Sequence, residues 1–132
     1  MTDPQSSSAH DKAVREMGRN FARRARAATR KREQAIDQRR VAAMEQIETL
    51  VQRFKDDDPH LRAIVLFGSL AAGTPDNPNF DIDLAVDSDK YWELLGIALD
   101  QPIPVDLVDL PRAARHIRGR IEAEGRWLYG HE

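Results

Sequence analysis

The apolar positions of this chain divide it into two parts near residue 40. Of its 26 Ile, Leu and Val residues, only Val14 and Ile36 precede residue 41. Residues 12–40 contain no proline and many Ala, Arg, Gln and Glu residues, which favours helix, but their apolar stripe is thin and mostly alanine. We therefore predict a basic helical N-terminal extension over residues 1–40 and a packed domain over residues 41–132.

Beyond residue 40 the pattern alternates between helical and extended segments. Residues 41–54 repeat apolar residues at helical spacing. Residues 63–67 form a continuous apolar run typical of a buried strand, and residues 80–86 alternate with the period of two that marks a half-buried strand. We further expect strands over 103–110 and 127–129 and helices over 89–99 and 111–125, with Trp92, Leu95 and Leu99 facing inward. The pattern predicts an α+β domain.

The composition excludes several classes of protein. The 132 residues are 41% hydrophobic and 32% charged, which is globular composition. No apolar run approaches the roughly 18–20 residues that span a bilayer. The opening residues lack the apolar core of a signal peptide, and the chain has no cysteine. We therefore expect a cytoplasmic protein without disulfides, thiolate metal sites or a cysteine nucleophile.

The charges are distributed as unevenly as the apolar residues. Residues 12–40 contain eleven Lys/Arg against three Asp/Glu, whereas residues 41–132 contain nine against seventeen. Three interpretations of the basic segment stay open: a solvated helix or arm, a helix that docks on an acidic or helical partner, and a contact with nucleic-acid phosphates. Phe21 is the only aromatic residue there that could stack on a base, so nucleic acid is the less favoured partner.

Two motifs could carry chemistry on neighbouring segments. Gly68-Ser69 directly follows the apolar run of residues 63–67. A glycine there lets the backbone approach a phosphate, and the start of a following helix points N–H groups at the anion. Asp81 and Asp83 stand two residues apart on one strand, so their carboxylates point the same way at a Cβ spacing of about 6–7 Å. That spacing suits shared binding of a hard cation such as Mg²⁺. Taken alone, Gly68-Ser69 also fits an ordinary turn, and the two aspartates also fit a solvent-facing strand edge.

A third candidate is Asp106, which lies inside an apolar strand. A carboxylate in such a strand requires a partner, because unpaired burial is costly. If this strand lies beside the one that carries the first two carboxylates, the three cluster, and their repulsion favours a bound cation. The alternative is that Asp106 or Asp109 caps a turn or pairs with an arginine such as Arg112 or Arg115.

Together these motifs resemble the signature of the polymerase-β-like nucleotidyltransferases. The segments VLFGSLAAG, FDIDLAV, VDLVDL and EAEGRWLYG are most similar to the minimal nucleotidyltransferases (MNT), small proteins often encoded beside HEPN-domain partners. The resemblance covers residues 41–131 and implies a mixed sheet flanked by helices. The chain departs from the family pattern in having eleven residues, Leu70 to Phe80, before the first aspartate, and in placing Phe80 where a serine is common.

The resemblance also implies a reaction and the roles of the motifs in it. The reaction is transfer of a nucleoside monophosphate, AMP from ATP above all, to an acceptor hydroxyl. Gly68 and Ser69 would bind the phosphates of the donor. Asp81, Asp83 and Asp106 would be catalytic and would bind two Mg²⁺ ions, and Asp106 would also help to deprotonate the acceptor.

The acceptor is expected on a separate protein, since larger members of the superfamily use a second domain to grip it. The MNT resemblance implies an antitoxin that adenylylates a tyrosine of a HEPN ribonuclease toxin. Two alternatives stay open. One is a non-catalytic antitoxin that neutralises its partner by binding, and the other is a small-molecule nucleotidyltransferase completed by a partner subunit.

Overall fold

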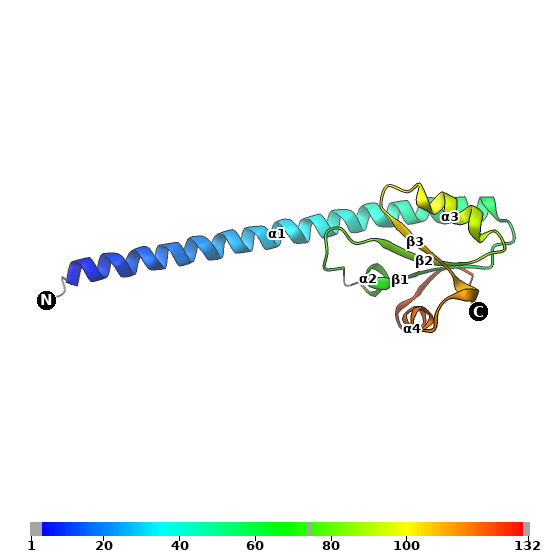
Figure 1. The fold of residues 1–132 in the computed structure, drawn as a ribbon. Helices are drawn as coiled ribbons and strands as arrows, with labels where there is room; N and C mark the ends of the chain where they lie inside the picture. Colours follow the sequence, from blue (N-terminus) through cyan, green and yellow to red (C-terminus); the bar gives the residue numbers. More distant parts are fainter. Residues whose placement is uncertain (1–3, 74, 131–132) are drawn as a thin grey trace. The chain divides into compact units, whose positions relative to one another are not determined.

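The computed structural model describes residues 4–73 and 75–130, with side chains from residue 9 onward. The chain divides into two compact units, one ending at Ala35 and one beginning at Ile36. The elements labelled in Figure 1 are the helices α1 (Pro4–Asp57), α2 (Gly68–Ala72), α3 (Tyr91–Leu99) and α4 (Arg115–Glu124), the 3-10 turn η1 (Leu110–Arg112), and the strands β1 (Ala63–Phe67), β2 (Ile82–Asp87), β3 (Val105–Asp109) and β4 (Arg126–Tyr129).

The unit that ends at Ala35 is helical throughout its described part. The side chains of residues 9–35 are exposed, apart from the partly covered Ala22. Val14, Met17 and Phe21 are 53%, 70% and 75% exposed. The predicted helix is therefore confirmed, and its apolar stripe is open to solvent within this unit.

The unit that begins at Ile36 is built on a mixed four-stranded sheet in the order β3-β2-β1-β4. β1 runs antiparallel to β2 and β4, and β2 runs parallel to β3. The register pairs Phe67 with Asp83 and Asp83 with Asp106. The end of β1 therefore meets the beginnings of β2 and β3. The mixed sheet flanked by helices that the resemblance implied is confirmed.

One face of the sheet packs against α3 and the part of α1 that belongs to this unit (Figure 1). Leu50 and Phe54 of α1 and Leu94 of α3 are at most 1% exposed. They pack on the inward residues of the strands, which recur at every second position: Ile64, Leu66, Ile82, Leu84, Val86, Val105 and Leu107. Burial of each such side chain stabilises the fold by about 1.5–3 kcal/mol.

The opposite face of the sheet packs against α4 (Figure 1). Val65, Phe67 and Ala85 form its apolar part together with Ile121 of α4. Side chains alternate between the two faces of a strand, so the residues flanking Leu84 and Leu107 also belong to this second face. They include Asp83 and Asp106, which places two carboxylates on the α4 side of the sheet.

The inward face predicted for α3 is wrong at Trp92 and Leu99 but holds in part at Leu95, which is partly buried and packs against the core. Trp92 and Leu99 are 74% and 73% exposed, while Leu94, Ile97 and Ala98 are buried. Two stripes on this short helix both have helical spacing, one through Trp92, Leu95 and Leu99 and one through the buried residues. Periodicity alone cannot predict which stripe is buried, because that depends on how α3 packs on the sheet.

Two predicted boundaries also shift. Pro111 lies in the 3-10 turn η1, and α4 begins only at Arg115, because Ala113 and Ala114 are extended, with ψ of 139° and 153°. β2 begins at Ile82, so Asp81 directly precedes the strand. None of the helices within residues 4–73 and 75–130 is long and apolar enough to cross a membrane.

The packing predicts opposite outcomes for two aromatic residues of this unit. Phe54→Ala empties a fully buried position and should lower the free energy of unfolding by about 3–5 kcal/mol. Trp92→Ala removes a side chain that is 74% exposed and should change it by less than about 1 kcal/mol. Urea unfolding followed by circular dichroism measures both values. Equal losses for the two variants would contradict the assignment of the α3 face.

Candidate active site

The centre of the site is the turn between β1 and α2. Gly68 has a φ of 76°, in the left-handed region that favours glycine. A Cβ built on Gly68 would overlap Oδ2 of Asp83. The position therefore requires glycine for two reasons, the backbone conformation and the close approach to the carboxylate. Ser69 follows at the second position of α2 and is partly buried.

The three predicted aspartates differ in their position relative to the strands and in their exposure to solvent. Asp83 and Asp106 face each other as register partners on β2 and β3, so the strand pairing brings them together as predicted. Asp81 precedes β2 by one residue, and its side chain is 58% exposed. Asp83 is partly buried and Asp106 is exposed. The pair is thus a half-buried carboxylate beside one that solvent reaches.

The surroundings of Asp83 favour its neutral form in the metal-free protein. Its pKa is raised from 3.8 to about 6, first by burial and then by the negative charge of Asp106. Asp81 and Glu124 act in the same direction, and the positive charge of Arg120 opposes them. Besides burial, three carboxylates therefore raise the pKa of Asp83, and the charge of one arginine opposes them.

A comparison of the sequence with known protein families identifies the family of this chain. The model of the family described as polymerase beta, nucleotidyltransferase, matches residues 45–132. The chain belongs to the polymerase β nucleotidyltransferase family. The family match contains the turn and all three aspartates, and it begins beyond the N-terminal unit.

Individual proteins are also similar to this chain over part of its length. The protein adenylyltransferase MntA of Shewanella oneidensis is 38% identical over 90 residues, which cover 61% of this chain and 63% of MntA. This chain thus spans less than two thirds of the length of that relative. Two crystal structures of mutant MntA-HpeT toxin–antitoxin pairs match 64% of this chain at TM-scores of 0.51 and 0.52. They are 33% and 32% identical to it and are covered over 73% and 72% of their own chains.

The candidate site contains two residues that the sequence analysis missed, both on α4. Oε1 of Glu124 accepts a hydrogen bond of 3.1 Å from the backbone N–H of Gly68. Arg120 lies 3.5 Å from the same carboxylate oxygen and places its guanidinium 5.6 Å from the centre of the Phe67 ring. The sequence signal was their spacing of four residues, which puts both on one face of a helix.

A further contact holds the segment in front of β2. Nε of Arg39 in α1 donates a 2.7 Å hydrogen bond to the carbonyl oxygen of Phe80, and the guanidinium lies 5.3 Å from the centre of the Phe80 ring. The same guanidinium is 4.0 Å from Oδ1 of Asp81. Phe80 is 6% exposed. The phenylalanine that departs from the family pattern is thus a buried anchor, and Arg39 ties it to the first aspartate.

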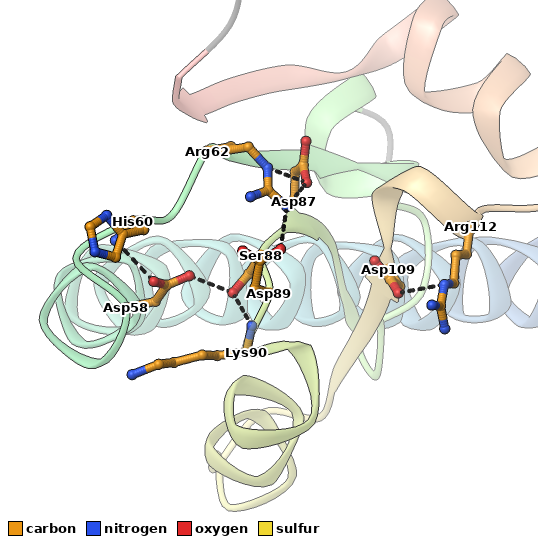
Figure 2. Close-up of polar contacts among 9 residues, drawn as sticks. All are labelled: Asp58, His60, Arg62, Asp87, Ser88, Asp89, Lys90, Asp109 and Arg112. Atoms are coloured by element: carbon orange, nitrogen blue, oxygen red, sulfur yellow. Dashed lines mark hydrogen bonds and ion pairs between the residues drawn. The ribbon is translucent and has the colours of Figure 1, made fainter.

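A second polar cluster, at the other end of β2, has a structural role (Figure 2). Asp58 is 3% exposed and accepts a 2.6 Å hydrogen bond from Oγ of Ser88. Arg62, just before β1, donates to Asp87 at 2.8 Å and to Asp89 at 3.0 Å. These contacts join the end of α1 to the start of β1 and the end of β2. They stabilise the sheet at the end away from the register pair Asp83–Asp106.

The structure also shows which of the two aspartates of β3 lies next to an arginine. Asp109 faces Arg112, with 3.9 Å between Oδ2 and Nε (Figure 2). Asp109 is therefore the aspartate that pairs with an arginine. Asp106 instead faces another carboxylate across the strand pair. Two aspartates three residues apart on one strand thus lie in opposite electrostatic settings.

The donor set fits a hard divalent cation by its chemistry. Carboxylate oxygens are the ligands that Mg²⁺ prefers, and a cation would relieve the repulsion that raises the pKa of Asp83. Within residues 4–73 and 75–130, no group of three or more His, Asp or Glu side chains is placed so that it could hold a metal ion. The assignment of Asp81, Asp83 and Asp106 as metal ligands therefore stays a prediction.

Asp83 gives a pH-dependent prediction for the metal-free protein. Its pKa is about 6 in the folded state against 3.8 as the ordinary value, so the folded state binds more protons between these values and loses stability as pH rises through them. Asp83→Asn removes this loss. In EDTA, its urea midpoint should exceed that of the wild type at about pH 8, and the difference should vanish at about pH 4 and below.

The matched control for this experiment is Asp37→Asn, which changes an exposed carboxylate on α1. Its midpoint should follow that of the wild type across the same pH range. If Asp83→Asn also follows the wild type at every pH, the repulsion inferred at Asp83 is absent.

Proposed function

We propose that this chain transfers AMP from ATP to a tyrosine hydroxyl of a HEPN-domain toxin and so acts as its antitoxin. The observation that carries the proposal is the contact of the Gly68 turn with Asp83, beside the register partner Asp106. A phosphate-binding turn next to paired carboxylates suits phosphoryl chemistry. The similarity to a protein adenylyltransferase and to chains of toxin–antitoxin pairs supports the choice of acceptor.

The residues of the turn would bind the donor. The backbone N–H of Gly68 and the hydroxyl of Ser69 would donate hydrogen bonds to the β- and γ-phosphates at the start of α2. Glu124 now accepts from that N–H, so its carboxylate must leave when phosphate oxygens arrive. Repulsion between the carboxylate and the incoming phosphates supplies a reason for it to move.

The aspartates would act on the reacting groups. Asp81 and Asp83 would hold two Mg²⁺ ions, with Asp106 as a further ligand of one of them. Bound there, Mg²⁺ neutralises charge that develops on the α-phosphate and on the leaving pyrophosphate. Asp106, the exposed member of its pair, would take the proton of the acceptor hydroxyl as the oxygen attacks the α-phosphorus. The bond from the α-phosphorus to the bridging oxygen breaks, and pyrophosphate leaves.

The proposal assigns these tasks to two regions. Residues 41–132 would be the nucleotidyltransferase domain, and residues 1–40 a basic extension that contacts a partner rather than the reacting groups. The reaction would take place in the cytoplasm, where nucleoside triphosphates are available. No contact with nucleic acid is needed for it.

One observation favours a second candidate, a non-catalytic antitoxin that neutralises its partner by binding. The N–H of Gly68 is already bonded to Glu124, so the turn is satisfied without a nucleotide. An antitoxin of this kind would silence the toxin while leaving its mass unchanged. A mass measurement therefore separates the two candidates.

Mass spectrometry of a HEPN-domain toxin co-expressed with this chain tests the proposal. We expect one or more AMP additions on a toxin tyrosine with the wild type. Asp83→Asn and Asp81→Asn should each lower the yield by about 100-fold or more, since each removes a charged metal ligand. EDTA should stop the reaction of the purified proteins.

The control is again Asp37→Asn, which keeps the net charge of the aspartate variants and lies on an exposed part of α1. It should modify the toxin as the wild type does. A toxin that is neutralised without any added mass would support the binding candidate. Full modification by Asp83→Asn would show that the carboxylates have been assigned wrongly.

A further inference from the structure

A groove outside the active site has no role in the proposed reaction. It has a volume of about 650 Å³ and runs along α1 beside the edge strand β4. Its apolar lining comes from Val41, Met44, Ile47 and Val51 of α1 and from Leu128 of β4. Val41 is 61% exposed and Met44 is 40% exposed. Apolar surface of this kind, gathered in one groove, marks a docking site.

The charges of the groove restrict what can occupy it. Glu45 and Glu48 belong to its lining and are exposed. The lining also contains Arg40, so its charged side chains are two glutamates and one arginine, with a net charge of −1. The complementary occupant is therefore an apolar ridge flanked by cations.

The chain itself contains such a ridge in its N-terminal unit. Val14, Met17 and Phe21 lie on one face of a helix and are 53%, 70% and 75% exposed. Residues 12–35 contain nine Lys/Arg against two glutamates. These are the two properties, apolar contact and positive charge, that the groove requires of an occupant.

The spacing of the two surfaces also agrees. Val14 and Phe21 are seven residues apart, and so are Met44 and Val51 in the groove. A separation of seven residues is two helical turns, the repeat at which two helices interlock their side chains. If the two helices run antiparallel, Met17 then falls level with Glu48, and if they run parallel it falls level with Ile47, one residue before Glu48.

We propose that the groove binds the Val14–Phe21 ridge of a second copy of this chain, so that the protein self-associates through α1. The contact buries the apolar ridge of one copy in the groove of the other and sets the basic flanks of the ridge beside Glu45 and Glu48. Because the charges lie at the exposed rim, the association weakens as salt rises.

Sedimentation equilibrium of the full chain over a range of protein concentrations tests the proposal. The wild type should self-associate, and Phe21→Glu on the ridge and Val41→Glu in the groove should each weaken association by about tenfold or more. Trp92→Glu is the control, because it places the same charge on an exposed aromatic residue that lines neither surface. Circular dichroism checks that each variant keeps its helix content.

Cross-linking gives a second readout, which is clean because the chain has no cysteine. A mixture of Met17→Cys chains and Glu48→Cys chains should form a disulfide-linked dimer of one chain of each kind. Arg26→Cys replaces the first partner in the control, since nine residues of helix turn the side chain to the opposite face from Met17. That mixture should form the heterodimer far less.

Three results would overturn the proposal. They are a wild type that stays monomeric at all concentrations, association that neither glutamate variant weakens, and equal cross-linking by the test and control mixtures. If the groove binds only a HEPN-domain toxin, the wild type will stay monomeric, and Val41→Glu will weaken the toxin complex.

Discussion

The close approach of the Gly68 backbone to the carboxylate of Asp83 is the contact on which the rest of the site depends. It exists because β1 ends where β2 begins, with Phe67 and Asp83 as register partners. The left-handed φ of Gly68 then turns the chain into α2 directly above that carboxylate. A side chain at residue 68 would separate the turn, which we propose binds phosphate, from the acidic pair, and the two parts of the proposed site would no longer adjoin.

The fold supports this contact at an electrostatic cost. Asp83 faces Asp106 on the α4 side of the sheet, where burial and like charge raise its pKa to about 6. Apolar packing of Phe67 against Ile121 holds α4 over the same face. α4 in turn brings Arg120 and Glu124 to the turn. The same helix therefore closes the core and supplies both a cation and a competing carboxylate to the site.

The strands and the candidate aspartates could be predicted from local pattern, whereas the mixed sheet was implied by the family resemblance and the pairing of Asp83 with Asp106 was expected only if their strands were neighbours. Alternation with a period of two fixes which side of β2 carries Asp83, and the apolar strand around Asp106 indicates that it pairs nearby. The buried face of α3 could not be predicted, because Trp92 and Leu94 each begin a stripe of helical spacing. Glu124 was missed for a different reason: its partner Gly68 lies 56 residues away, and only the packing of α4 brings them together.

Gly68→Ala, compared with Gly73→Ala, tests the central claim most directly. Both glycines have a positive φ, 76° and 74°, so both variants bear a similar backbone strain of about 1–3 kcal/mol. Only at Gly68 does the added Cβ meet Asp83, because nothing lies within 4 Å of a Cβ at Gly73. Calorimetry of ATP binding with Mg²⁺ should show binding by Gly73→Ala and none by Gly68→Ala, with circular dichroism confirming that both are folded. Equal binding by the two folded variants would contradict the account.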